Sequence, residues 1–127
     1  MDITNTMIET LGIEVKEVSD QGVIAVMPVD ERTRQPFGIL HGGASVALAE
    51  TAASIGAFHF IDQDTEICVG LEINANHIRS KKDGFVTAHA VPFHKGKSTM
   101  VWDIKITDEE GQLICISRCT MAVIKKK

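Results

Sequence analysis

Hydrophobic and polar residues alternate along most of the chain, but one long stretch near the middle is almost wholly apolar. Residues 12–29 alternate around an Asp-Gln-Gly turn, which predicts a β-hairpin, and residues 3–11 before them predict a short helix. Residues 42–58 (GGASVALAETAASIGAF) are rich in alanine and contain no proline, so they predict a longer helix. Because this helix has no polar face, we expect other parts of the protein to surround it.

Four further β-segments are expected after a loop at about residues 59–65, at residues 66–79, 85–93, 98–107 and 112–124. The connections between them are short and carry turn residues. Short connections favour antiparallel neighbours, because a parallel pair needs a crossover of a dozen or more residues. One apolar helix and a mainly antiparallel sheet predict an α+β fold in which the sheet wraps around the helix.

Composition and charge narrow the class of protein. With 127 residues, of which 44% are hydrophobic, residues 1–127 fit a single globular domain. The net charge of −4 speaks against a nucleic-acid partner, and no apolar run approaches the ~20 residues that cross a bilayer. The first residues, MDITNTMIETLG, have no basic start and no apolar signal core, so we expect no secretion. The three cysteines form no disulfide framework, so we expect reduced thiols and a cytoplasmic protein without a membrane partner.

Glu50 is the only ionisable residue in the apolar helix. A carboxylate there loses hydration and requires a compensating partner, so it is either a structural residue or a functional one. The helix opens with His41-Gly42-Gly43, where free N–H groups and the helix dipole favour partial negative charge. The two glycines leave space for a carbonyl oxygen, which is the geometry of an oxyanion hole, although a plain helix cap has the same sequence.

Two further residues are candidates for the same site. Gln35 lies in the loop before the helix, and its side-chain amide can donate a hydrogen bond to the same carbonyl oxygen. Ser54 lies one turn after Glu50 on the same helix face, where it can hold the carboxylate or a water molecule. The histidines and cysteines show no metal-ligand spacing, so no metal is expected.

Two sequence runs, QPFGILHGGASVALAE (Gln35–Glu50) and GLEINANHIRS (Gly70–Ser80), resemble the hotdog-fold acyl-CoA thioesterases. The most similar branch contains the 4-hydroxybenzoyl-CoA thioesterase of the Arthrobacter type and the 1,4-dihydroxy-2-naphthoyl-CoA hydrolases, and the similarity extends over about residues 10–124. The resemblance implies a hotdog fold in which Glu50 is the catalytic carboxylate and the Gly42 N–H polarises the thioester carbonyl. It places Gln35, His41 and Ser54 at supporting positions.

The coenzyme A end of such a substrate is polyanionic, and residues 77–99 carry five lysine and arginine side chains against a single carboxylate, that of Asp83. A basic region on an acidic protein suggests a phosphate site, although solvated strand ends explain the charge equally well. In the resembling family, the positions that contact coenzyme A correspond to Gly70, His77, Ile78, Arg79, Ser80, His94, Lys95, Gly96, Lys97 and Ser98. Coenzyme A is part of the substrate, and no separate cofactor is expected.

Helix geometry predicts an obligate homodimer. Gly42 and Glu50 are eight residues apart, which is about 12 Å along a helix at ~1.5 Å per residue. A glutamate side chain does not cover that distance, so both residues act on one thioester only if they come from different chains. Two antiparallel helices related by a two-fold axis satisfy this condition. In the resembling family such dimers pair into homotetramers.

The sequence favours a thioester hydrolase with an acyl-CoA substrate, whose acyl group we expect to be aromatic, 1,4-dihydroxy-2-naphthoyl being one candidate. It leaves open whether Glu50 is a nucleophile or a general base, and which acyl group is cleaved. Two alternatives are a hotdog enoyl-CoA hydratase or dehydratase, with His41 as the base, and a non-catalytic acyl-CoA-binding module. The presence of Glu50 favours the hydrolase over both.

Overall fold

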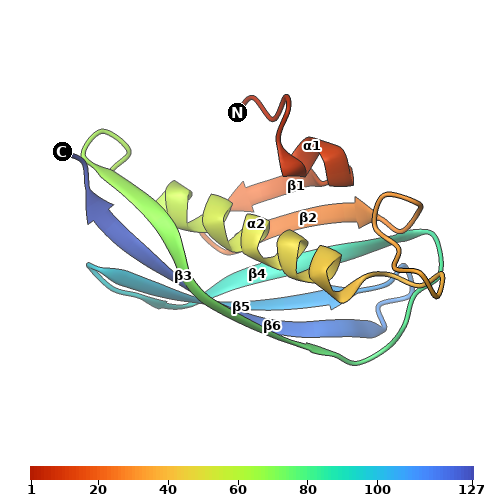
Figure 1. Cartoon of the computed structure of the whole chain (residues 1–127). Coiled ribbons are helices and arrows are strands. Elements are labelled where there is room, and N and C mark those ends of the chain that lie inside the picture. Colours follow the sequence, from red (N-terminus) through yellow and green to blue (C-terminus); the bar gives the residue numbers. More distant parts are fainter.

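A computed structural model of the chain describes all residues, 1–127. It contains one long helix lying across the concave face of a six-stranded antiparallel sheet (Figure 1). The elements in chain order are α1 (Met7–Leu11), β1 (Glu14–Ser19), β2 (Gly22–Pro28), α2 (Gly42–Phe60), β3 (Glu66–His77), β4 (Phe85–Lys95), β5 (Thr99–Thr107) and β6 (Leu113–Lys125). The strand order is β1-β2-β4-β5-β6-β3, so β1 and β3 are the two edges of the sheet.

The predicted elements are confirmed. The N-terminal helix is shorter than its predicted span, the hairpin lies at β1 and β2, and the four later strands begin and end within about two residues of their expected bounds. The long helix extends to Phe60, two residues beyond its predicted end. An α+β architecture in which the sheet wraps around one helix is therefore correct.

One inference about the sheet was wrong. The short connection between β3 and β4 led us to expect antiparallel neighbours, but β3 pairs with β6 and β4 pairs with β2 and β5. Residues 78–84 instead cross the end of the sheet. Seven extended residues span up to about 23 Å. Three strand spacings amount to only about 14 Å, so a short segment is long enough for this crossover.

The helix lies close to the sheet because its inner side carries small residues. Ala49, Ala52, Ala53 and Gly56 are buried there. A Cβ atom added at Gly56 would come within 2.3 Å of the Trp102 ring, so glycine is required where the indole packs on the helix. The composition that predicted a helix therefore also permits close packing against the sheet.

The opposite side of α2 is only partly covered within one chain. Val46, Ala47, Glu50, Thr51 and Ser54 all lie there, and each is half-buried. The expectation that protein surrounds this helix is thus met by the sheet on one side alone.

The three cysteines have free thiols. Cys115 and Cys119 share the inner face of β6 and are fully buried. The chain has no helix whose length and apolarity would let it span a bilayer.

Candidate active site

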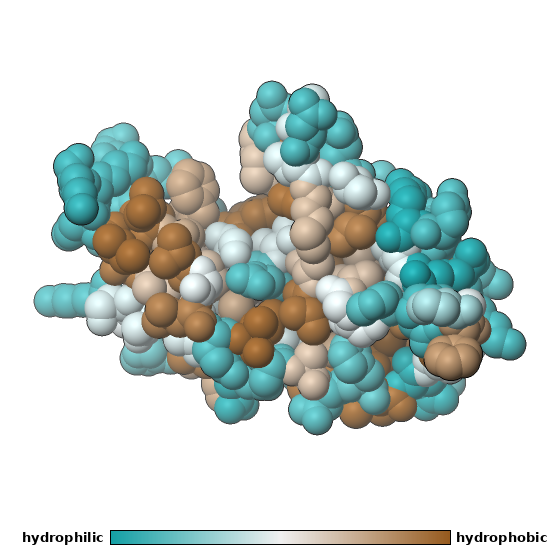
Figure 2. Space-filling model, viewed as in Figure 1, coloured by the Kyte–Doolittle hydropathy of each residue, from teal (hydrophilic) through white to brown (hydrophobic).

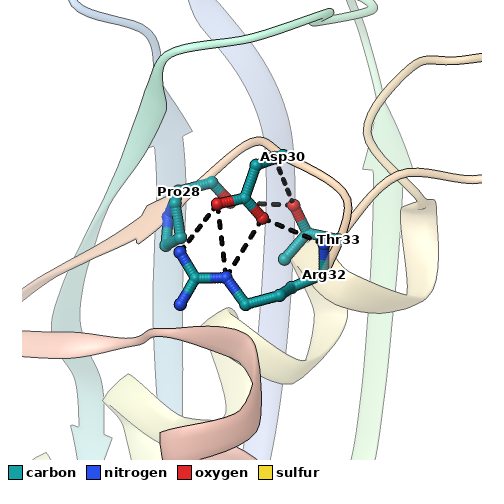
Figure 3. Close-up of polar contacts among 4 residues, drawn as sticks. All are labelled: Pro28, Asp30, Arg32 and Thr33. Carbon is teal, nitrogen blue, oxygen red and sulfur yellow. Dashed lines mark hydrogen bonds and ion pairs between the residues drawn. The ribbon is translucent and has the colours of Figure 1, made fainter.

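The loop between β2 and α2 fixes the start of the long helix. Arg32 pairs with the Asp30 carboxylate through its Nε and through a terminal nitrogen at 2.7 Å, and the hydrogen bond from this guanidinium lowers the pKa of Asp30 (Figure 3). The buried Thr33 hydroxyl donates to the Pro28 carbonyl at 2.8 Å and accepts from the Asp30 N–H (Figure 3). The Thr33 carbonyl then accepts from the His41 N–H at 2.8 Å, so this folded loop positions the residue that precedes the helix.

The helix N-terminus leaves one backbone donor free. His41 is the N-cap, and its Nδ1 accepts a hydrogen bond from the Gly43 N–H at 2.8 Å. The N–H groups of Ala44 and Ser45 donate to the His41 carbonyl, whereas the Gly42 N–H has no acceptor within the chain. A Cβ atom on Gly42 would meet the His77 ring at 2.8 Å, so the imidazole of His77 lies against this position. The predicted oxyanion-hole donor is therefore uncommitted, and its surroundings are tight.

The side-chain amide of Gln35 has free N–H donors, as predicted from the sequence. Its side-chain oxygen accepts a short hydrogen bond from the Phe37 N–H, which fixes the orientation of the amide. The side-chain NH₂ group has no acceptor in the chain, and the residue is half-buried. Its backbone N–H donates to the Ile39 carbonyl at 2.8 Å within the same loop. The loop thus holds the amide while leaving its two N–H bonds free for a ligand.

The Glu50 side chain makes no hydrogen bond and no ion pair within the chain, although the residue is half-buried. A Cβ atom on Gly70 would lie 2.5 Å from its carboxylate oxygen, so β3 passes closely beside this side chain at a glycine. Burial, together with the negative charges of Glu50 and Glu72, raises the pKa of Cys119 to about 12. A partly desolvated carboxylate without a structural partner is the expected state of a reactive group rather than of a structural one.

Ser54 follows Glu50 by one turn, as predicted, but it does not hold the carboxylate in this chain. Its hydroxyl points toward the Met121 sulfur at 3.9 Å, which is a weak contact. The hydroxyl is therefore available to a ligand beside Glu50.

Gly42 and Glu50 are not brought together within one chain. They lie in the same uninterrupted helix, eight residues and about 12 Å apart. Each nevertheless presents an uncommitted group, an N–H donor in one case and a carboxylate in the other.

Of the residues predicted to contact coenzyme A, Gly70 lies beside Glu50, and the other nine fall into two groups at opposite ends of α2. His77 lies against Gly42, the first helical residue, and Ile78, Arg79 and Ser80 follow it. The second group lies at the β4–β5 turn, where Lys95 Nζ is 4.1 Å from the ring centroid of Phe60, the last helical residue. These ends are about 27 Å apart along the helix. One chain therefore does not form both parts of a single nucleotide site.

One of the cations in this basic region is already paired. Lys81 forms a 2.5 Å ion pair with Glu109, and its hydrogen bond is the main reason that the pKa of Glu109 falls to about 2. Arg79, Lys82 and Lys97 are exposed and have no carboxylate partner. The positive charge available to a phosphate is thus smaller than the sequence count indicated.

An apolar groove beside Glu50 was not predicted from the sequence. It lies between α1 and α2, has a volume of about 950 Å³, and is lined by residues of α1, β1, α2 and β3. Figure 2 shows apolar surface bordering a hollow below α1. The available signal was Met7-Ile8, an apolar pair between the polar residues 4–6 and 9–10. The groove supplies a binding space directly next to the carboxylate.

A curved antiparallel sheet around one helix, with an uncommitted carboxylate and a glycine-rich helix start, defines a hotdog-type hydrolase site. The family model described as "Thioesterase superfamily" matches residues 37–115. The chain belongs to the thioesterase superfamily, and the predicted hotdog fold and thioester-hydrolase class are confirmed.

Similar proteins cover nearly the whole chain. The ComA2 protein of Bacillus subtilis (strain 168) is 63% identical over 99% of this chain and 100% of its own length. A 1,4-dihydroxy-2-naphthoyl-CoA hydrolase of Listeria monocytogenes is 59% identical over 94% of this chain and 96% of its own. The solved structure of a variant of thioesterase PA1618 from Pseudomonas aeruginosa has a TM-score of 0.95 and 46% identity, and covers 98% of this chain and 89% of that one.

Proposed function

We propose that this protein hydrolyses an aromatic acyl-CoA, of the 1,4-dihydroxy-2-naphthoyl-CoA class, to the free acid and coenzyme A. The observation that carries the proposal is the half-buried Glu50 carboxylate, which has no partner and lies at an apolar groove. The substrate class rests on the Listeria monocytogenes relative that carries this name. The size and apolar lining of the groove agree with a fused-ring acyl group.

In the proposed reaction, the thioester carbonyl oxygen accepts hydrogen bonds from the Gly42 N–H and from the Gln35 amide. Charge that develops on this oxygen is stabilised by these fixed donors. Glu50 of the second chain either removes a proton from the attacking water or attacks the carbonyl carbon to form an anhydride, which water then hydrolyses. In both routes the carbon–sulfur bond breaks and coenzyme A leaves as a thiolate, which needs no strong acid.

Two separate features support a two-fold dimer as the active form. The partly uncovered side of α2 carries Glu50, so two antiparallel copies of the helix would place each carboxylate near the other chain's Gly42. The same operation would move the partner's Lys95–Ser98 segment toward His77–Ser80, which one chain keeps far apart. We expect these dimers to pair into tetramers, as the resemblance implies.

The geometry at His41 does not support the hydratase alternative. His41 Nδ1 accepts from the Gly43 N–H, so a neutral imidazole carries its proton on Nε2. The exposed nitrogen is then a hydrogen-bond donor, whereas a hydratase requires a base at this place. The cap thus favours a supporting role for His41.

A substrate panel tests the proposed reaction. Thiol release from naphthoyl-, benzoyl-, phenylacetyl-, octanoyl- and acetyl-CoA is measured with the wild-type protein. We expect kcat/KM for the naphthoyl ester to exceed that for acetyl-CoA at least ~10-fold, because the apolar groove rewards a large acyl group. Absence of thiol release from every ester would overturn the proposed function, and a preference for acetyl-CoA would overturn the aromatic assignment.

Subunit complementation tests the shared site. Co-expression of a Glu50→Ala chain with a Gly42→Pro chain gives mixed dimers in which one site keeps Gly42 from the first chain and Glu50 from the second. With random pairing, about a quarter of wild-type activity should return, although each variant alone is inactive. Co-expression of Glu50→Ala with Glu50→Gln is the matched control and should restore nothing. If mass spectrometry shows mixed dimers but no activity returns, each chain builds its own site.

A further inference from the structure

Polar side chains line only one wall of the apolar groove. Only Glu50, Thr51 and Ser54 contribute polar side chains to it, and all three come from α2. The Thr51 hydroxyl is already bonded to the Ala47 carbonyl at 2.7 Å, and the Ser54 hydroxyl points toward Met121. The opposite wall, formed by α1 and β1, is apolar. A ligand in the groove therefore meets polar groups only along α2, at the side where the carboxylate lies.

The wall formed by α1 and β1 exposes apolar side chains that a bound molecule would cover. Met7 is 60% exposed and Val18 is 40% exposed, and both line the groove with the half-buried Ile8. A methionine side chain is flexible and polarizable, so it adapts to apolar ligands of different shape. Such surface, next to a reactive carboxylate, indicates contact with a ligand rather than with solvent.

The position of α1 depends on few contacts. The helix has five residues, too few to be stable in isolation, and none of them is fully buried. It ends at Gly12, whose positive φ of 74° closes the turn and lets the Ile13 N–H bond to the Ile8 carbonyl at 3.0 Å. Ile8 and Leu11 pack against the core, while Met7 faces the groove. The wall is thus anchored at its C-terminal end and presents Met7 and Ile8 to the groove.

We infer that α1 forms the distal wall of the acyl pocket, and that Met7 and Ile8 set the size of the acyl group that the enzyme accepts. The occupant is the acyl part of the thioester, with its carbonyl at Glu50 and its apolar body directed toward α1. The inference rests on the proposed function and deepens it. It predicts selectivity for acyl groups that extend beyond a single ring or a short chain.

The test compares esters that differ only in the distal part of the acyl group. The ratio of kcat/KM for 2-naphthoyl-CoA to that for benzoyl-CoA is measured for wild type, Ile8→Trp and Met7→Trp. Filling the groove should lower this ratio at least ~10-fold, since steric exclusion acts only on the larger ester. Met7 is exposed, so its replacement keeps the test valid if Ile8→Trp fails to fold. Thr10→Trp is the matched control, because Thr10 is exposed on the same helix and does not line the groove.

Four results would overturn the inference. A ratio that is unchanged in the folded α1 variants, or that changes equally in Thr10→Trp, would show that α1 does not contact the acyl group. A change in sedimentation without a change in the ratio would assign this surface to a second copy of the chain. In these three cases wild-type hydrolysis persists, so only the role of α1 fails. A wild-type protein that hydrolyses neither ester would remove the proposed function as well.

Discussion

Replacing Glu50 with glutamine is expected to lower kcat for thioester hydrolysis at least ~100-fold, the scale of a lost catalytic base, and a lost nucleophile would cost no less. Glutamine has nearly the same volume and can occupy the same place beside Gly70, so the fold should persist. The amide neither accepts a proton from water nor attacks a carbonyl carbon effectively. Steady-state thiol release, with KM determined separately, measures the effect.

Glu72→Gln is the matched control for this substitution. Glu72 is an exposed carboxylate on β3, and its charge also reaches Cys119, but it does not line the groove. Its replacement should leave kcat within about 2-fold, as expected for a surface change away from the site. Normal hydrolysis by Glu50→Gln, or equal losses in both variants, would show that the Glu50 carboxylate does not take part in the reaction.

Gly42→Pro is expected to lower kcat about 100- to 1000-fold, because it deletes the backbone N–H that we assign to the oxyanion hole. The backbone at this position is compatible with proline, and the atoms nearest to the added Cβ atom belong to the His77 ring. Gly42 is the first helical residue, where proline is favoured, and its N–H has no partner that would be lost. His41 before it has φ −70° and ψ 130°, an extended conformation compatible with a following proline.

Gly42→Ala separates the donor from the side chain at this position. Alanine adds a Cβ atom that meets the His77 ring, as proline also does, but it retains the N–H. His77 is exposed and its ring can move, so we expect Gly42→Ala to lose less than about one-tenth of what Gly42→Pro loses in kcat. Equal losses in the two variants would attribute the effect to crowding at His77, and the oxyanion-hole assignment would be wrong.

The sequence predicted the elements well because the signals for them are local. Alternating residues marked the strands, and an alanine-rich run without proline marked α2. The order of the strands in the sheet was harder to predict from the sequence. Pairing of β3 with β6 depends on residues about fifty positions apart, and a short connection between β3 and β4 is compatible with a crossover as well as with a hairpin.

The sequence predicted individual residues of the candidate site, but not how they are arranged in space. Glu50 and Gly42 stood out because a lone carboxylate and a double glycine are conspicuous in an apolar helix. The sequence did not show that the basic residues lie at two opposite ends of α2. The C-terminal end of β3 and the β4–β5 turn are close in sequence, but the first lies at the start of α2 and the second at its end. The groove was hidden because the place of α1 depends on the packing of Ile8 and Leu11 against the folded core rather than on a local sequence pattern.

Trp102 gives an optical check on folding in every experiment above that does not introduce a second tryptophan. It is the only tryptophan in the chain, it is fully buried against Gly56, and its indole N–H has no acceptor. An indole in such dry surroundings fluoresces at shorter wavelength than one in water, so the emission maximum reports whether α2 is still seated on the sheet. A variant that loses turnover but keeps the blue-shifted emission has therefore kept the packing of α2 on the sheet.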